Sequence, residues 1–184
     1  MKIFDCTTYY DEPLIMDIRF NVLNEFVEKF IVVEAPFSHA GNPKKLNFDI
    51  NDFKKFKDKI IYLVIDKQPE NIITKDKLDS GEKRMNSIKR IEQSYDFMKN
   101  GLSDAIDDDL IIISDNDEIP NLESKQFKNS KKNLIIFKQL FFYYKFNLFY
   151  DKMPWYGSKA CKKKNLLSFP WLRNIKSKKY PIWR

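Results

Sequence analysis

The chain has 184 residues, of which 43% are hydrophobic and 15% aromatic, with 16 Phe and 9 Tyr against only 4 Gly. This composition excludes collagen-like, disordered and linker-dominated chains, and the length suits one globular domain over residues 1–184. Two cysteines and one histidine are too few for a disulfide framework or a four-ligand zinc site. We expect Cys6 and Cys161 to be buried and reduced.

The net charge of +7 conceals two parts of opposite charge. Residues 1–123 carry 17 basic and 25 acidic side chains, whereas residues 124–184 carry 16 basic and one acidic. The basic part indicates an anionic partner such as a sugar nucleotide, a membrane surface or a nucleic acid, although a solvated surface explains it equally well. No signal-peptide pattern begins the chain and no apolar run reaches the ~20 residues of a membrane span, so we expect a soluble, cytoplasmic protein.

Four apolar runs predict strands, at residues 2–6, 30–33, 60–65 and 110–113. Amphipathic segments between them predict helices, and this alternation is typical of an α/β protein with a mostly parallel sheet covered on both faces. Ligands bind outside the carboxyl ends of such strands. Glu34 and the cluster at residues 115–118 both follow strands, so we expect them on one rim of the sheet.

The first predicted helix begins at Pro13, and its apolar stripe predicts a buried face. That face comprises Leu14, Ile18, Val22 and Phe26, with Ile15 and Leu23 beside it. Arg19 is expected on the solvent side. The second helix spans residues 82–100 and ends at Gly101. Its predicted stripe comprises Met85, Ile88, Ile91, Tyr95 and Met98.

The last third of the chain has a different pattern. Residues 134–137 and 140–149 predict an aromatic antiparallel pair, with residues 141–144 in the sheet core rather than forming a sugar platform. An irregular basic tail follows. The sequence therefore predicts an α/β fold with an antiparallel aromatic C-terminal extension.

Asp115 and Asp117 are separated by one residue, directly after the apolar run 110–113. Both carboxylates can face one point only if the backbone bends there, and that geometry suits a hard cation such as Mg²⁺ or Mn²⁺. Such a cation completes its shell with water and substrate phosphates, which indicates a nucleotide or phosphoryl substrate. A solvated acidic turn, or an Asp that caps the next helix, explains the same residues.

These residues resemble glycosyltransferase family 17, the β-1,4-mannosyl-glycoprotein β-1,4-N-acetylglucosaminyltransferase family. The segment at residues 114–120, Ser-Asp-Asn-Asp-Glu-Ile-Pro, is similar to the family's Ser-Asp-x-Asp-Glu-Ile-Pro signature. Other similar pieces follow the family's order over nearly the whole chain: Phe4-Asp5-Cys6, Glu12 with Arg19 and Leu23, Val32-Val33-Glu34, Ser38, Gly41, Lys44, Leu46, Phe48, Asn86-Ser87-Ile88-Lys89-Arg90 and Trp155-Tyr156-Gly157.

The resemblance implies a GT-A type nucleotide-sugar fold and transfer of N-acetylglucosamine from UDP-GlcNAc, with inversion, to a glycan or lipid-linked acceptor. It implies that Asp115 and Asp117 bind Mn²⁺ or Mg²⁺, which stabilises the charge on the leaving diphosphate. Residues 1–120 would bind the donor and the basic residues 121–184 would face the acceptor or an anionic membrane.

The resemblance also implies roles for other side chains, each with a structural alternative. Glu34 would hold the ribose or uracil, or is an ordinary rim carboxylate. Arg84-Met85-Asn86 stands where the family has Gln-Arg-Asn, so Arg84 contacts the diphosphate or lies on a solvated helix face. Glu118 is either the general base or fixes the turn that presents the two aspartates.

Trp155 and Tyr156 are candidates for stacking on the acceptor sugar. His39 is expected to make a loop-stabilising hydrogen bond. Family members continue to a Gly-Trp-His segment whose histidine would complete the metal site. No such segment precedes the last residue here, so the chain is truncated or another ligand replaces that histidine.

Two other functions fit parts of the sequence. A haloacid-dehalogenase-type phosphohydrolase would use Asp115 and Asp117 as nucleophile and acid–base partner, but it needs a further acidic pair downstream, and only Asp151 follows Glu123. A non-catalytic nucleic-acid-binding module would use the basic segment and its aromatic residues.

Overall fold

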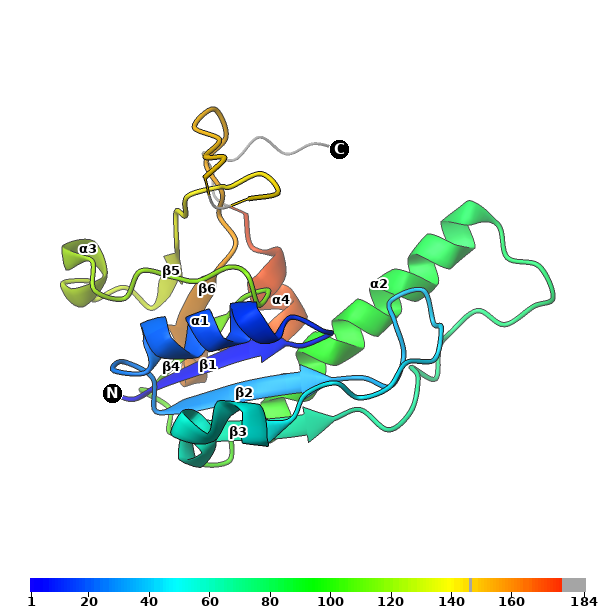
Figure 1. Cartoon of the computed structure of the whole chain (residues 1–184), viewed down its shortest axis with the longest axis horizontal. Coiled ribbons are helices and arrows are strands. Elements are labelled where there is room, and N and C mark those ends of the chain that lie inside the picture. The colour runs from blue at the N-terminus through cyan, green and yellow to red at the C-terminus, as the bar shows by residue number, and fades with distance from the viewer. Residues whose placement is uncertain (146, 177–184) are drawn as a thin grey trace.

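The computed structural model describes residues 1–145 and 147–176. Its centre is a six-stranded sheet in the order β3-β2-β1-β4-β6-β5 (Figure 1). The strands are β1 (Ile3–Thr8), β2 (Lys29–Glu34), β3 (Ile60–Val64), β4 (Leu110–Ile113), β5 (Leu134–Ile136) and β6 (Lys159–Lys162). The first four are parallel, β6 is antiparallel to β4, and β5 is antiparallel to β6. The predicted α/β class and mostly parallel sheet are confirmed.

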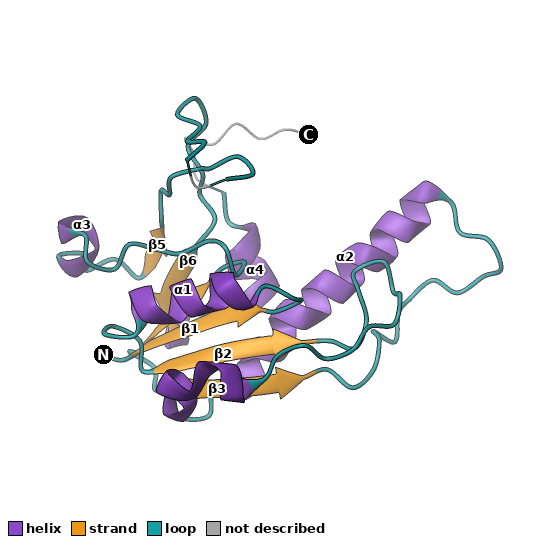
Figure 2. Cartoon of the chain, viewed as in Figure 1, coloured by secondary structure: helices purple, strands orange, loops and turns teal. Residues whose placement is uncertain are grey.

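Helices cover both faces of the sheet (Figure 2). Helix α1 (Pro13–Leu23) and the 3-10 segment η1 (Ile50–Lys59) lie on one face, and α2 (Ser80–Phe97) and α4 (Phe169–Asn174) lie on the other. Short helical segments η2 (Met98–Gly101), α3 (Lys125–Lys128) and η3 (Lys163–Asn165) complete the order. Because successive strand residues point to opposite faces, Val32 and Ile112 pack beneath α1, while Ile31 and Ile113 pack beneath α2. The sheet is therefore buried on both sides.

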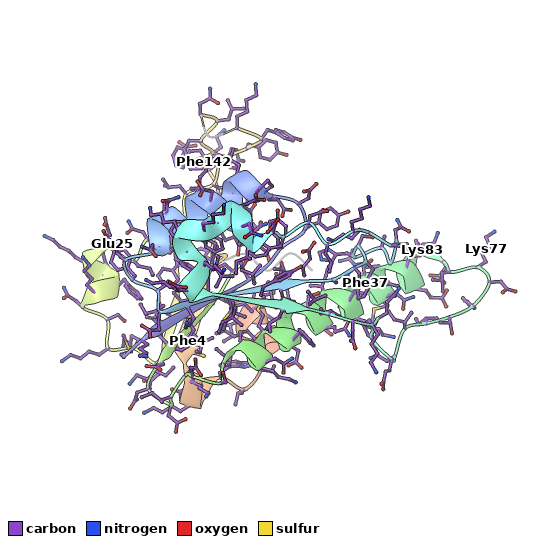
Figure 3. The ribbon with its side chains drawn as sticks, turned by 60° about the horizontal axis from the view of Figure 1, so that its bottom comes forward. Phe4, Glu25, Phe37, Lys77, Lys83 and Phe142 are labelled. Atoms are coloured by element: carbon purple, nitrogen blue, oxygen red, sulfur yellow. The ribbon has the colours of Figure 1, made fainter. Side chains whose placement is uncertain are left out.

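Helix α2 is only partly a core helix. Its capping box, formed by Asp79 and Glu82, starts the helix in solvent beyond the sheet, where Lys77 and Lys83 lie (Figure 3). Met85, predicted on the buried stripe, is 48% exposed, whereas Tyr95 and Met98 near the other end are buried. The predicted stripe is thus wrong at its start, because the first turns of α2 extend past the sheet edge.

The predicted buried face of α1 is also wrong. Leu14 and Val22 are exposed, and the residues that face the sheet are Met16, Arg19, Phe20 and Leu23. Arg19, expected on the solvent side, is fully buried because its guanidinium finds a buried carboxylate on β1. This ion pair sets the rotation of the helix about its axis.

The predicted antiparallel pair in the last third is wrong in its partners. Strand β5 pairs with β6, a basic segment that the sequence assigned to an irregular tail. Residues 140–149 contribute only isolated bridges, among them Phe142 to Phe149, and Phe146 lies outside the described residues. The aromatic run 141–144, expected in the sheet core, is largely exposed. Residues 177–184, the end of the predicted basic tail, also lie outside the described residues.

Cys6 and Cys161 are buried and unpaired, as expected. Among the described residues, no helix has both the length and the apolarity needed to cross a bilayer.

Candidate active site

Arg19 is the structural centre of the rim where β1 and β4 end. Its Nε and Nη2 donate to the two oxygens of Asp5, at 2.8 and 2.6 Å, and both side chains are almost completely inaccessible to solvent. Because a buried charge is tolerated only when paired and hydrogen-bonded, Asp5 fixes the position of the guanidinium. Sequence reasoning missed this pair, although Asp5, a charge inside an otherwise apolar strand, was its signal.

The same guanidinium holds the loop that follows β4. Its Nη1 donates to the carbonyl oxygens of Asp115, Asn116 and Glu118 at 3.1–3.2 Å, and Nη2 donates to the Ser114 hydroxyl at 2.9 Å. One side chain therefore satisfies three carbonyl groups of a tight turn. This contact stabilises the bend that the Asp-x-Asp spacing required.

Asp115 is half-exposed and has cationic and phenolic neighbours. Arg173, on α4, donates to both of its carboxylate oxygens, at 3.1 and 3.3 Å, and Tyr95, on α2, donates to one of them. The Arg173 guanidinium also lies over the Tyr95 ring, 4.6 Å from its centroid. Burial and the Asp115 charge raise the pKa of Tyr95, so this hydroxyl stays protonated as a donor. The sequence analysis identified neither partner.

Asp115 lines three pockets that meet at the rim. The His39 pocket also includes Tyr10, Lys44, Arg90 and Arg173. The Lys159 pocket includes Tyr156, Lys159, Arg173 and Lys176. The Phe141 pocket includes Asp117, Lys138, Phe141 and Trp155. Asp115 is therefore accessible from two cationic pockets and from one aromatic pocket.

Asp117 is exposed at the Phe141 pocket. Partial desolvation and the neighbouring charge of Asp115 raise its pKa, so the two carboxylates are close enough to repel one another. No group of three or more Asp, Glu, His or Cys side chains in the described ranges is arranged to hold a metal ion. Asp115 and Asp117 supply two carboxylates from one turn, and a hard cation at this turn would have to fill its other positions with water and phosphate oxygens.

Glu118 fixes the turn from inside. Its two carboxylate oxygens accept hydrogen bonds from the Asp115 amide at 3.0 Å and from Trp155 Nε1 at 2.8 Å. Burial, followed by repulsion from Asp115, raises the pKa of Glu118. Gly157 packs against this pair so closely that an added Cβ would lie 2.2 Å from Glu118 Cδ. These contacts favour the turn-fixing alternative for Glu118, and they make Trp155 part of its support.

Glu34 is buried at the end of β2 and its carboxylate is fully engaged. It accepts from the Asn47 and Phe48 amides at 2.9 and 3.1 Å, from the Tyr62 hydroxyl at 2.7 Å, and from Lys44. Glu34 therefore anchors the loop after β2 against β3. Lys44, which it holds, lines the His39 pocket.

The predicted donor residues on α2 separate in space. Asn86 is buried, and its amide bonds to the Ile73 N–H and C=O, both at 2.9 Å, which pins the preceding loop. Arg84 lies on the exposed side of α2. The arginine that reaches the pocket is Arg90, whose Nη1 donates to the His39 carbonyl at 3.1 Å and which packs under Gly41 at φ +92°. That hydrogen bond stabilises the His39 loop through its backbone.

Trp155 and Tyr156 both line the Lys159 pocket, and Trp155 also lines the Phe141 pocket. Trp155 stacks on Phe141 at 5.5 Å, and Tyr156 lines the Lys159 pocket. Lys159, on β6, is 7% exposed and donates to the Gly157 carbonyl at 3.0 Å. Burial lowers the pKa of Lys159 to about 8. The sequence placed Lys159 in an irregular basic tail, so it gave no indication that this lysine is buried in a strand beside the pocket.

One family model matches the chain, that of glycosyltransferase family 17, over residues 1–169. No curated protein and no solved structure matches it. The match includes the Arg19 clamp, the turn with Asp115 and Asp117, and the strand that carries Lys159, whereas Arg173 lies just beyond it. It supports a transferase over a phosphohydrolase or a nucleic-acid-binding module. The chain therefore belongs to glycosyltransferase family 17, and it is a glycosyltransferase.

Proposed function

We propose that this enzyme transfers N-acetylglucosamine from UDP-GlcNAc to a glycan or lipid-linked acceptor, with inversion, using Mn²⁺ or Mg²⁺ held by Asp115 and Asp117. In this proposal residues 1–120 bind the nucleotide sugar within a GT-A type fold. Residues 121–184 face the acceptor or an anionic membrane.

The observation that carries the proposal is the position of Asp115 where three pockets meet, on a turn immobilised by Arg19. A transferase must bring a nucleotide, a diphosphate and an acceptor to one point. Because the turn is held by three backbone contacts to a buried side chain, its carboxylates need little reorganisation when substrate binds.

The two cationic pockets suit the donor. Arg90 and Lys44 line the His39 pocket, and Arg173 lines both this pocket and the Lys159 pocket. Guanidinium and ammonium donors on either side of Asp115 can bind the phosphate oxygens of a UDP-sugar. When bound, the divalent cation would supply Lewis-acid stabilisation of the leaving diphosphate.

Arg173 must leave Asp115 before that carboxylate can bind a cation. Its guanidinium now uses both oxygens of Asp115, and it faces two pockets that can hold phosphate. In our proposal it exchanges the carboxylate for the diphosphate of the donor. Metal and donor then favour one another's binding. The donor draws Arg173 away from Asp115, and the metal, by occupying Asp115, leaves Arg173 free to bind the diphosphate.

The Phe141 pocket suits the acceptor, since it combines aromatic walls with Asp117 and Glu118. Aromatic rings pack on the apolar faces of sugars, and Trp155 forms part of this wall. Glu118 keeps its place as the candidate base on the acceptor hydroxyl, with a raised pKa that favours proton uptake. The same carboxylate also fixes the turn, through its hydrogen bonds with the Asp115 amide and Trp155 Nε1.

The test is release of UDP from UDP-GlcNAc by the purified chain with Mn²⁺, with Mg²⁺ and with chelator, in the presence and absence of sugar acceptors. We expect turnover only with a divalent cation. Asp115→Asn and Asp117→Asn should lose at least about a hundredfold in kcat/KM with unchanged thermal unfolding. Asp17→Asn, on the exposed side of α1, is the matched control and should leave turnover unchanged.

Turnover that persists in chelator would refute the metal role. Thermal-shift measurements with UDP-GlcNAc and other nucleotide sugars test the donor independently, because a ligand that binds only the folded state raises its melting temperature. A shift with another nucleotide sugar, and none with UDP-GlcNAc, would refute the donor assignment.

A further inference from the structure

An aromatic hairpin, residues 138–155, projects from the sheet beside the site. It forms the yellow and orange loops above the sheet in Figure 1, and Figure 3 labels Phe142 within it. The described part of this hairpin exposes seven large apolar or aromatic side chains: Leu140, Phe142, Tyr143, Tyr144, Leu148, Phe149 and Tyr150. Such a concentration on a soluble surface marks an interaction site.

The tip of the hairpin has a backbone conformation and an exposed ring that both disfavour folding. Tyr144 is 89% exposed and has a φ of +63°, a left-handed conformation that costs a residue with a Cβ about 1 kcal/mol or more. Neighbouring rings contact each other, Tyr143 with Tyr144 and Phe142 with Phe149, rather than the protein core. The fold therefore presents these rings outward at a cost, and a partner that buries them would offset it.

The charges of the hairpin identify that partner. Lys138, Lys145 and Lys152 are exposed among the aromatic residues, and Asp151 is the one acidic residue in the whole segment 124–184. Tyrosine rings lie at the level of lipid headgroups, and lysines beside them bind anionic lipids while their stems cover apolar surface. Aromatic tips with flanking lysines thus suit the interface of an anionic bilayer better than a neutral soluble glycan.

We propose that the described residues of the hairpin, 138–145 and 147–155, dock this enzyme on an anionic lipid bilayer, with Tyr144 in the headgroup layer. The role of this docking in catalysis rests on the proposed function, and it deepens that proposal. Lys138 and Phe142, at the base of the hairpin, line the Phe141 pocket together with Asp117. Docking therefore places the acceptor pocket at the lipid surface, where the sugar headgroup of a lipid-linked acceptor would enter it.

The experiment is co-sedimentation of the full chain with vesicles of phosphatidylcholine alone or mixed with phosphatidylglycerol, in chelator and without donor. We expect binding to the mixed vesicles only, weakening as salt is raised. The tip variant Tyr144→Asn/Leu148→Ser should lower the partition coefficient about tenfold. Asparagine at 144 tolerates the left-handed backbone, so the hairpin keeps its shape. Lys145→Ala and Lys152→Ala should each cost about fivefold.

The matched control is Leu14→Ser/Ile106→Ser, which removes two equally exposed apolar side chains far from the hairpin in sequence, at 66% and 67% exposure. It should bind vesicles like the unmodified chain. Equal binding by the tip variant and the unmodified chain would overturn the proposal. So would equal binding to neutral vesicles, or a concentration-dependent self-association that the tip variant abolishes.

A second measurement gives the depth of the tip. In the variant Tyr144→Trp we expect stronger quenching by brominated lipid than in Leu14→Trp, and no difference would contradict docking through the tip. Because neither experiment uses metal, donor or turnover, docking without transferase activity would refute the proposed function and leave this inference intact. Turnover on soluble acceptors without vesicle binding would do the reverse.

Discussion

Residues 1–123 and the described part of residues 124–184 are built in different ways. The first region contains four parallel strands whose apolar runs are buried on both faces, and its polar residues at the rim are held by buried partners such as Asp5 and Glu34. The second region has two short antiparallel strands, a projecting hairpin and a high density of lysine. The first region provides a rigid rim, and the second adds cationic and aromatic walls to it.

Asp115 lies where the two regions meet. The first region supplies Arg19 and Tyr95, which orient its turn and its carboxylate, and the second supplies Arg173. The first region thus fixes the geometry of the turn and supplies Lys44 and Arg90 to the His39 pocket, whereas the second region supplies the guanidinium that pairs with Asp115. Substitutions in the first region should therefore affect folding strongly, and those in the second should affect ligand binding more than folding.

The largest expected effect comes from breaking the rim of the first region. Arg19→Met should lower the free energy of unfolding by about 3–5 kcal/mol, because it leaves Asp5 as an unpaired buried charge and three carbonyl groups without their donor. Urea unfolding measures this. The double variant Asp5→Ala/Arg19→Met should recover part of the loss, and a double variant as unstable as the sum of the singles would contradict the ion-pair explanation.

Lys159 is an exception to the difference between the two regions, because it is a buried lysine in the second region. Its folded-state pKa of about 8 lies below the usual lysine pKa of 10.5, so the unfolded chain binds more protons between these values. The free energy of unfolding should therefore rise with pH from about 8 to 10.5, by up to about 3 kcal/mol relative to Lys159→Met. Chemical unfolding of both proteins across this range measures the difference, and parallel pH profiles would refute it.

Gly157→Ala should disturb the contact between the two regions. The new Cβ would lie 2.2 Å from Glu118 Cδ and 2.6 Å from Trp155 Nε1, so the hydrogen bond between these side chains must break. We expect a loss of about 1–3 kcal/mol in stability and a red shift of tryptophan emission. Gly81→Ala, near the start of α2, is the control, and a similar loss there would show that the effect is not specific to this contact.

Arg173→Ala should change binding more than stability. Asp115 and Arg173 are each 38% exposed, so their pair contributes at most about 1 kcal/mol. Removing the competing guanidinium should tighten Mn²⁺ binding in the absence of nucleotide by about fivefold, and it should weaken UDP binding. Calorimetry of Mn²⁺ and of UDP measures both, with Lys77→Ala, in the exposed loop before α2, as control. Weaker Mn²⁺ binding by Arg173→Ala would contradict the competition.

The smallest expected effect on stability is at the hairpin tip. Tyr144→Asn should change the free energy of unfolding by no more than about 0.5 kcal/mol, or raise it slightly, because it removes an exposed ring from a left-handed position. Thermal unfolding in the absence of lipid measures this. A loss above about 1 kcal/mol would mean that the hairpin is part of the folded core rather than an added surface.

Apolar runs determined the four parallel strands, because a strand buried on both faces needs a continuous apolar run whatever its neighbours. The Asp-x-Asp spacing predicted the turn at which the candidate site is proposed. The resemblance to glycosyltransferase family 17, carried by the order of short motifs along the chain, is confirmed over residues 1–169. These features depend on residues close to one another in sequence, so the sequence alone was sufficient.

Only the tertiary structure decided which side chains complete the site. Arg19 and Lys159 carry charges that predict exposure, yet both are buried. Asp5 on β1 pairs with Arg19, whereas Lys159 donates to the nearby Gly157 carbonyl and lies in the field of the Glu118 carboxylate, 41 residues earlier in the chain. Arg173 reaches Asp115 from 58 residues away, and β6 pairs with β5 across the aromatic hairpin. Such contacts depend on which elements pack together, and the local periodicity of the sequence does not show this.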